Sequence, residues 1–391
     1  MLKGVESSQN SETVSRLRGD KLQREGREET PLVFVYLGPD FPSYASSSLQ
    51  IALKTTPNPI VVLAEVPRPA HIPSAVEWIA VDSFYSGQEF ATFTLQPPYS
   101  EEFRDGFWLK TAERFFVLSE FMQWRKLATI FHGELDCLFF DLPEVERQIL
   151  EDGLCGVFLA RETESRCIGS LVYVNDSRVL RFVCTFILRN SHLGNEMDIL
   201  GAIPSGGEQG VYALPTAEFL YRESSDSSWP VAPRTPSFIV DGAVLGRWMF
   251  GVDPRNTGGR GTSNRIQNHK YGVPFESPLG ALTFRRNSRK EWQTQVLSPR
   301  GGIFNLAVLH VHSKVHKKLT PQYIDRLVRR LSVGKSSMIA PLQFGFPLGV
   351  GRRVLRQLGV IIKTRAGVGS ALKNLLSVGW WRGLRARLTD L

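Results

Sequence analysis

The sequence predicts an α/β fold in which helices flank a mixed, mainly parallel central sheet. Continuous apolar runs occur at residues 32–37, 60–64 and 127–131. Runs of this length without polar alternation are typical of strands that are buried on both faces. Between Trp108 and Gln123 the apolar residues recur at helical spacing, which predicts a helix packed on the sheet. Strands and helices in alternation predict parallel neighbours in one sheet.

The remaining elements are predicted from the same patterns. A Gly-Pro pair ends the first strand, and the Ser-rich segment that follows predicts a helix over residues 46–54. Another helix is expected after Arg178, and a basic amphipathic helix over residues 320–331. Gly- and Ser-rich residues at 204–210 predict a loop. Shorter strands are expected at residues 79–81, 137–140, 156–160, 170–174, 238–240 and 304–311.

Charge is concentrated at one end of the chain. The 391 residues are 42% hydrophobic, enough for a substantial core, and carry a formal net charge of +9. Residues 351–391 hold nine Lys or Arg and one acid, Asp390, so this segment alone accounts for +8. A nearly neutral body with a basic tail fits an anionic membrane surface better than a nucleic-acid cleft. We therefore expect no nucleic-acid partner.

Composition divides the chain into three parts. Residues 1–30 are rich in Ser, Glu, Arg and Gln, which predicts a disordered leader. Residues 31–335 contain most of the predicted strands and helices and form the expected globular domain. Residues 336–391 interleave Leu, Ile and Trp with Arg and Lys, which predicts a basic amphipathic, helical C-terminal extension. This extension either lies on a membrane or covers its own domain.

The compartment is predicted from what the sequence lacks. The four cysteines form no C-x-x-C pair, which favours a reducing environment over a disulfide framework. No apolar run approaches the roughly 18 residues that a membrane-spanning helix needs, and the first residues contain no apolar signal segment. We expect a cytoplasmic protein in peripheral contact with the inner membrane face.

A pair of carboxylates lies between two predicted strands. Glu134 and Asp136 are two residues apart at a strand end, so their side chains project to the same side and can share one cation. An E-x-D triplet alone is common in proteins, but its place between two apolar runs favours a metal site. Hard carboxylates bind Mg²⁺ or Mn²⁺ and leave positions for water and phosphates. Such an ion stabilises the charge that develops on a departing diphosphate.

A second candidate cluster lies in the late strand. Strand alternation places His310 and His312 on one face, with Lys314 near the strand end. Imidazole ligands favour Mn²⁺ over Mg²⁺. We expect His312 to bind the metal, and His310 and Lys314 to contact the donor diphosphate. The alternative is that one histidine faces solvent and the other is a satisfied core residue.

Three further acids are candidate catalytic residues. Glu196 and Asp198 lie at the start of a predicted helix, where either could accept the proton of an acceptor hydroxyl. Acids in a first helical turn are equally well explained as partners of the helix dipole. Asp241 ends the predicted strand at 238–240, where a site residue, a turn or an N-cap would each fit.

Taken in order, several segments resemble bacterial glycosyltransferases with a GT-A-like (Rossmann-like) fold that act in surface polysaccharide or glycolipid synthesis. The resemblance spans roughly residues 32–320. It departs from the family at Gly133 and Leu135, which flank Glu134 where an apolar and a polar residue are more usual. The segments that carry it are residues 113–115 (ERF), 130–136 (IFHGELD), 169–174 (GSLVYV), 195–198 (NEMD), 238–243 (FIVDGA) and 310–314 (HVHSK).

The resemblance implies a metal-dependent glycosyltransferase that moves a sugar from a nucleotide-sugar donor to a saccharide or lipid-linked acceptor. It implies a donor site built from the first strands and the acidic triplet, with His312 and Lys314 closing on the metal and diphosphate. Two alternatives remain. One is a catalytically inactive GT-A-like scaffold, and the other is a metal-dependent phosphohydrolase that would use the same carboxylates.

We expect the chain to co-sediment with anionic liposomes, and to lose this binding when residues 340–391 are removed, because most of the net charge lies there. Co-sedimentation of both forms with anionic and with neutral vesicles measures the difference. Equal binding by the two forms would rule out membrane contact through the tail.

Overall fold

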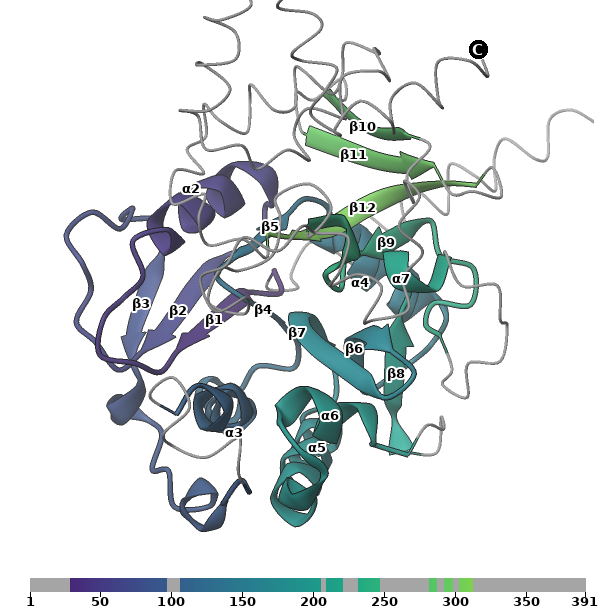
Figure 1. Ribbon diagram of the computed structural model, residues 1–391. Coiled ribbons are helices and arrows are strands. Elements are labelled where there is room, and N and C mark those ends of the chain that lie inside the picture. The colour runs from purple at the N-terminus through teal and green to yellow at the C-terminus, as the bar shows by residue number, and fades with distance from the viewer. Residues whose placement is uncertain are drawn as a thin grey trace, which may run out of the picture. The chain divides into compact units, whose positions relative to one another are not determined.

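A computed structural model describes seven stretches of the chain, from residue 29 to residue 311. The predicted leader, apart from its last two residues, the predicted helix at 320–331 and the basic C-terminal extension lie outside them. Within the described residues, two sheets and their helices form an α/β arrangement (Figure 1). The described stretches are residues 29–96, 106–204, 209–220, 231–246, 281–286, 292–297 and 302–311.

The larger sheet has seven strands in the order β3-β2-β1-β4-β7-β6-β8. β7 runs antiparallel to its neighbours β4 and β6, and every other neighbouring pair is parallel. The predicted mixed, mainly parallel sheet is therefore confirmed. The strands are β1 (Leu32–Tyr36), β2 (Ile60–Ala64), β3 (Glu77–Ala80), β4 (Ile130–Gly133), β6 (Val157–Thr163), β7 (Arg166–Val174) and β8 (Val211–Leu214).

A smaller sheet joins segments from distant parts of the chain. Its order is β10-β11-β12-β5, all antiparallel, and β9 pairs in parallel with β12. Because β5 follows β4 after three residues, the two sheets meet at the segment that carries Glu134 and Asp136. The strands are β5 (Cys137–Phe139), β9 (Phe238–Val240), β10 (Ala281–Arg286), β11 (Trp292–Leu297) and β12 (Ile303–His310).

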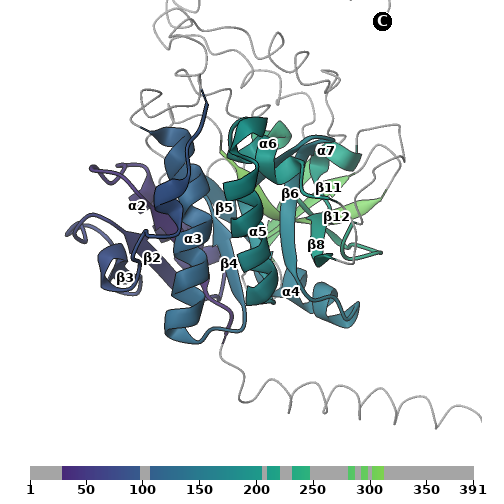
Figure 2. The same cartoon turned by 90° about the horizontal axis from the view of Figure 1, so that it is seen from below.

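Helices cover both faces of the larger sheet. α3, α5 and α6 pack on one face, where α3 and α5 lie side by side (Figure 2). α2 and α4 contribute to the core on the other face. Side chains alternate along β1, so Val33 belongs to the first core and Leu32 and Phe34 to the second. The helices are α2 (Ala45–Thr55), α3 (Phe107–Arg125), α4 (Leu142–Glu151), α5 (Ser177–Arg189), α6 (Glu196–Gly201) and α7 (Ala217–Leu220).

The structure shifts one predicted strand along the chain. Residues 127–131 were expected to be extended, whereas β4 begins at Ile130 and continues through Gly133. Lys126 adopts a left-handed conformation, with φ of 57°, that ends α3, and a short loop separates it from the strand. Pairing with β1 then sets the register, with Phe131 opposite Leu32 and His132 opposite Val33. His132 is therefore a strand residue inside the sheet.

His132 is buried as a neutral side chain. Its Nδ1 lies 3.0 Å from the carbonyl oxygen of Val33, which fixes the ring inside the core. Burial, and then the nearby charge of Arg114, lower the pKa of His132 from its ordinary value of 6.5 to about 3, against the opposing effect of the Val33 hydrogen bond. Between these two pKa values, His132 is protonated in the unfolded chain and neutral in the folded chain.

We expect His132 to make the fold acid-sensitive. Between pH 6.5 and about 3 the unfolded state takes up more protons at this residue, so its contribution to stability is lost as the pH falls through that window. Urea unfolding at neutral pH and at a pH inside the window measures the free energy of unfolding. This free energy should fall less between the two pH values for His132→Gln than for the unchanged chain. Equal losses in both proteins would contradict the assignment.

Candidate metal centre

The candidate site lies where the order of the larger sheet reverses. From β1 the chain adds β2 and β3 toward one edge, and then returns to place β4 on the opposite side of β1. In open α/β sheets, ligands bind at such a reversal, outside the carboxyl ends of the strands. Glu134 directly follows the carboxyl end of β4. The acidic segment thus occupies the position where this architecture places a ligand.

Four potential metal ligands converge there. Glu134, Asp136, Cys137 and His310 each offer one donor atom, and these atoms all lie within 4.8 Å of one another. His310 Nε2 is 3.6 Å from Glu134 Oε2 and 3.6 Å from Asp136 Oδ1. The two carboxylate side chains keep 21% and 15% of their surface exposed, so a cation can reach them from solvent. We call these four residues the metal cluster.

Strand pairing brings His310 to the carboxylates. β12 runs antiparallel to β5, with His310 directly opposite Cys137. The N–H of Val311 donates to the carbonyl oxygen of Asp136 at 2.9 Å. This bond extends the pairing into residues 134–136, which we call the acidic turn. The sequence predicts His310 as a donor contact and His312 as the metal ligand. In the structure His310 joins the two carboxylates, whereas His312 and Lys314 lie outside the described residues.

The charges of the metal cluster oppose one another. Burial lowers the pKa of His310, but the charges of Asp136 and Glu134 and the hydrogen bond to Gly242 outweigh it and raise the pKa to about 9. Burial, followed by the charges of Asp136, Glu134 and Asp241, raises the pKa of Cys137 well above its usual range. A protonated imidazole therefore partly balances the two carboxylates, and a bound cation would replace that proton.

A buried loop after β9 orients His310. Its Nδ1 lies 2.7 Å from the carbonyl oxygen of Gly242, so Nδ1 is assigned the proton and Nε2 faces the carboxylates. The carboxylate of Asp241 accepts hydrogen bonds from the backbone N–H groups of Leu245, Gly246 and His310, at 2.9, 2.8 and 3.1 Å. Asp241 is fully buried and ties the loop to β12.

Glu218 completes this loop and was not predicted from the sequence. Its buried carboxylate accepts the N–H groups of Gly242, Ala243 and Val244. Burial, and then the charge of Asp241, raise its pKa to about 8. A Cβ on Gly246 would lie 1.5 Å from the carbonyl oxygen of His310, so only glycine fits there. Acids and glycines are too common in sequences for this arrangement to be recognised before folding.

Arg114 joins the metal cluster to the helical side of the sheet. This residue of α3 donates to Glu134 at 2.9 Å and to Glu196 at 2.5 Å. Both its side chain and that of Glu196 are almost fully buried. A Cβ on Gly169 of β7 would lie 2.6 Å from the guanidinium, so the glycine leaves room for it. Arg114 therefore holds Glu134 by an ion pair and connects it to α6 through Glu196.

The predicted catalytic acids occupy different surroundings. Glu196, at the start of α6, is 1% exposed and bound to Arg114. Asp198 is half-buried, and its Oδ1 lies 3.1 Å from Nε of Arg166. Burial raises the pKa of Asp198, while the charge of Arg166 opposes that shift. Glu196 is linked to the metal cluster through Arg114, and Asp198 has a separate ion pair.

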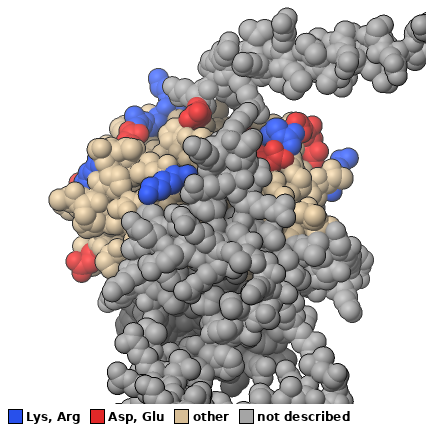
Figure 3. Space-filling model, turned by 90° about the horizontal axis from the view of Figure 1, so that it is seen from above, with Lys and Arg blue, Asp and Glu red and all other residues tan. Residues whose placement is uncertain are grey.

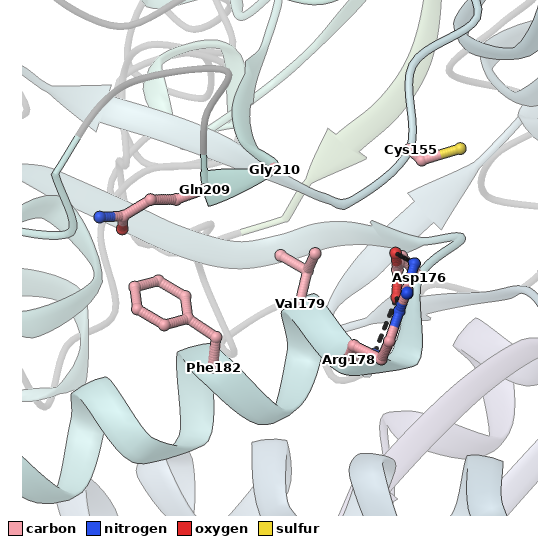
Figure 4. Close-up of a pocket in the computed structure, with 7 residues that line it drawn as sticks. All are labelled: Cys155, Asp176, Arg178, Val179, Phe182, Gln209 and Gly210. Atoms are coloured by element: carbon pink, nitrogen blue, oxygen red, sulfur yellow. Dashed lines mark hydrogen bonds and ion pairs between the residues drawn. The ribbon is translucent and has the colours of Figure 1, made fainter.

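A pocket of about 440 Å³ lies elsewhere, at the amino end of α5 (Figure 4). The guanidinium of Arg178 is held by the carboxylate of Asp176, at 2.7 and 3.1 Å. None of the predicted site residues lines this pocket, so it lends no support to the proposed chemistry. Its lining residues are Cys155, Asp176, Arg178, Val179, Phe182, Gln209 and Gly210.

In the view of Figure 3, Lys and Arg residues are interspersed with Asp and Glu residues on the described surface. The basic residues that dominate the net charge belong to the tail, outside the described part of the chain. Among the helices that the structure describes, none combines the length and the apolar character needed to cross a bilayer.

Comparisons with known proteins assign no family to the chain. No family model matches the chain, and no curated protein matches it. Among solved structures, the apo form of mouse xyloside xylosyltransferase 1 is similar to 48% of this chain over 86% of its own length. The two are 9% identical, with a TM-score of 0.35. A likeness of this degree assigns neither a family nor an activity to the chain.

We expect Arg114 to contribute strongly to stability. Arg114→Met would leave the buried carboxylate of Glu196 without its partner and should lower the free energy of unfolding by about 3–5 kcal/mol. Adding Glu196→Gln should recover part of that loss, since the unpaired charge is then removed. Urea unfolding of the single and double variants measures both effects.

Arg147 provides the matched control. It pairs with Glu144 and Glu151 on an exposed face of α4, and Arg147→Met should cost no more than about 1 kcal/mol because water screens the pair. Equal losses for Arg114→Met and Arg147→Met would contradict the role given to Arg114.

Proposed function

We propose that the chain is a metal-dependent glycosyltransferase that moves a sugar from a nucleotide-sugar donor to a saccharide or lipid-linked acceptor. One observation carries the proposal. Two carboxylates and an imidazole converge at the carboxyl end of β4, beside the reversal of strand order in a mainly parallel sheet. A partly exposed cation site at this position suits the binding of a diphosphate-linked donor.

The ligands fit the expected metal. Glu134 and Asp136 supply hard oxygen atoms, and His310 supplies a nitrogen, a set that Mn²⁺ accepts more readily than Mg²⁺. Three protein ligands leave coordination positions for water and for donor phosphates. When bound, the ion would stabilise the charge on the departing nucleoside diphosphate. The chain's own contribution is to hold the ligands in place, through Arg114 for Glu134 and through Asp241 and Glu218 for His310.

The acids divide into positioning groups and one candidate base. Glu196 and Asp241 are buried and bound to Arg114 and to backbone N–H groups, so we assign them positioning roles in place of the predicted catalytic ones. Asp198 is partly exposed, and its raised pKa suits a group that accepts a proton from an acceptor hydroxyl. We propose Asp198 as that base.

Two parts of the proposal rest on the sequence alone. Lys314, with His312, would contact the diphosphate, and both lie beyond the described residues. The basic extension over residues 336–391 would bring the enzyme to an anionic membrane surface, where a lipid-linked acceptor is presented. We also propose a cytoplasmic location at the inner membrane face, since the four cysteines form no C-x-x-C pair and the extension is basic.

The test is a panel of UDP-, GDP- and CMP-sugars incubated with the chain and Mn²⁺, with release of the nucleotide as the readout. We expect one donor class to be turned over, and chelation of the metal to abolish the release. Asp136→Asn should weaken Mn²⁺ binding, measured by calorimetry, by more than about 10-fold, the lower limit for losing even an outer-shell group. Glu151→Gln, an exposed acid on α4, should leave both readouts unchanged.

Other outcomes identify the alternatives. Hydrolysis of generic phosphoesters without selective donor turnover would indicate a metal-dependent phosphohydrolase. Donor binding that persists unchanged in Asp136→Asn, without any turnover, would indicate an inactive scaffold.

A further inference from the structure

Cys137 adds a fourth, sulfur ligand to the metal cluster. Its Sγ lies within 4.8 Å of the donor atoms of Glu134, Asp136 and His310, and the residue is fully buried. Of the four cysteines in the chain, Cys155 is exposed, and Cys167 and Cys184 are buried outside the cluster. A thiol contributes nothing to binding Mg²⁺, but it is a preferred ligand of Zn²⁺.

The position of this thiol is fixed by strand pairing. Cys137 and His310 are directly opposite each other in the antiparallel pair of β5 and β12. Side chains of such a pair leave the sheet on the same side, with Cβ atoms about 4.5–5.5 Å apart, so one ion can bridge them. The adjacent turn adds the two carboxylates from Glu134 and Asp136. The four donors are thus held by backbone pairing and by the turn, and do not depend on flexible surface side chains.

The four ligand atoms of the metal cluster favour a particular metal ion. One sulfur, one imidazole nitrogen and two carboxylate oxygens match the ligands of four-coordinate Zn²⁺. Sites in which the protein supplies all four ligands are closed, whereas catalytic sites keep a position open for water or substrate. Mn²⁺ and Mg²⁺ favour six oxygen-rich ligands and would leave the thiol unbound. The same residues can therefore form two metal sites that differ in whether Cys137 takes part.

We propose that Cys137 lets the metal cluster bind a thiophilic divalent ion, such as Zn²⁺, in a closed four-ligand state that excludes the hard ion needed for donor binding. This inference rests on the proposed function, because it concerns regulation of the same cluster. On binding, the Sγ–H bond of Cys137 and the Nε2–H bond of His310 break, both protons go to solvent, and Sγ–metal and Nε2–metal bonds form. A metal ion deprotonates a thiol that coordinates it.

Co²⁺ tests the proposal, because it occupies zinc sites and gives a sulfur-to-cobalt charge-transfer band in the near ultraviolet. The full chain titrated with Co²⁺ should develop this band, and added Zn²⁺ should abolish it. Cys137→Ser should lose the band, while Cys155→Ser, which changes an exposed cysteine outside the cluster, should keep it. A band that persists in Cys137→Ser would overturn the proposal.

A second measurement needs no variant and covers the case in which Cys137→Ser fails to fold. X-ray absorption of the Zn²⁺-loaded chain should show one sulfur at about 2.3 Å together with nitrogen and oxygen ligands. A shell of nitrogen and oxygen alone would refute sulfur ligation.

Mn²⁺ separates this proposal from the proposed function. If Mn²⁺ supports donor turnover and the sulfur signals are absent, only the inference about Cys137 fails. If sulfur ligation is seen and no nucleotide-sugar is turned over, the proposed function fails and the zinc site stands. If Mn²⁺ supports donor turnover and the sulfur signals are also present, added Zn²⁺ should displace Mn²⁺ from the unchanged chain. The Cys137→Ser variant should still bind Mn²⁺, and Zn²⁺ should no longer displace it.

Discussion

The antiparallel pairing of β5 with β12 is the constraint on which the candidate site depends. It joins a strand from the middle of the chain to one near the end of the described residues, and it places His310 beside Glu134 and Asp136. Backbone hydrogen bonds set this register, and a shift of one residue would turn the imidazole to the opposite face of the sheet. The loop held by Asp241 and Glu218 then fixes which ring nitrogen faces the carboxylates.

Buried charge is the second constraint, and it links the site to the rest of the fold. Arg114 lies between Glu134 and Glu196, so α3, α6 and the acidic turn share one guanidinium. Glu196 cannot be solvated by water at this depth, and its ion pair with Arg114 replaces that solvation. Gly169 provides the space that the guanidinium occupies. The arginine therefore belongs equally to the core and to the candidate metal centre.

The topology explains where these residues meet. The chain builds β1, β2 and β3 outward and then returns to β4, which leaves the carboxyl ends of β1 and β4 beside a reversal in strand order. The acidic turn follows β4 at that point and leads straight into β5 of the second sheet. A site shared by two sheets can combine oxygen ligands from one turn with nitrogen and sulfur from a strand pair.

The sequence alone determined the fold class and the acidic pair. Continuous apolar runs and the helical spacing of residues 108–123 predict the mainly parallel sheet and α3, because burial on two faces leaves a local pattern. Glu134 and Asp136 are two residues apart, so their proximity is also local. Tertiary structure decided the rest. Contacts between distant segments, which no local pattern records, place four further residues at the site. They bring His310 and Cys137 to the carboxylates, Arg114 between Glu134 and Glu196, and Glu218 to the loop that orients His310.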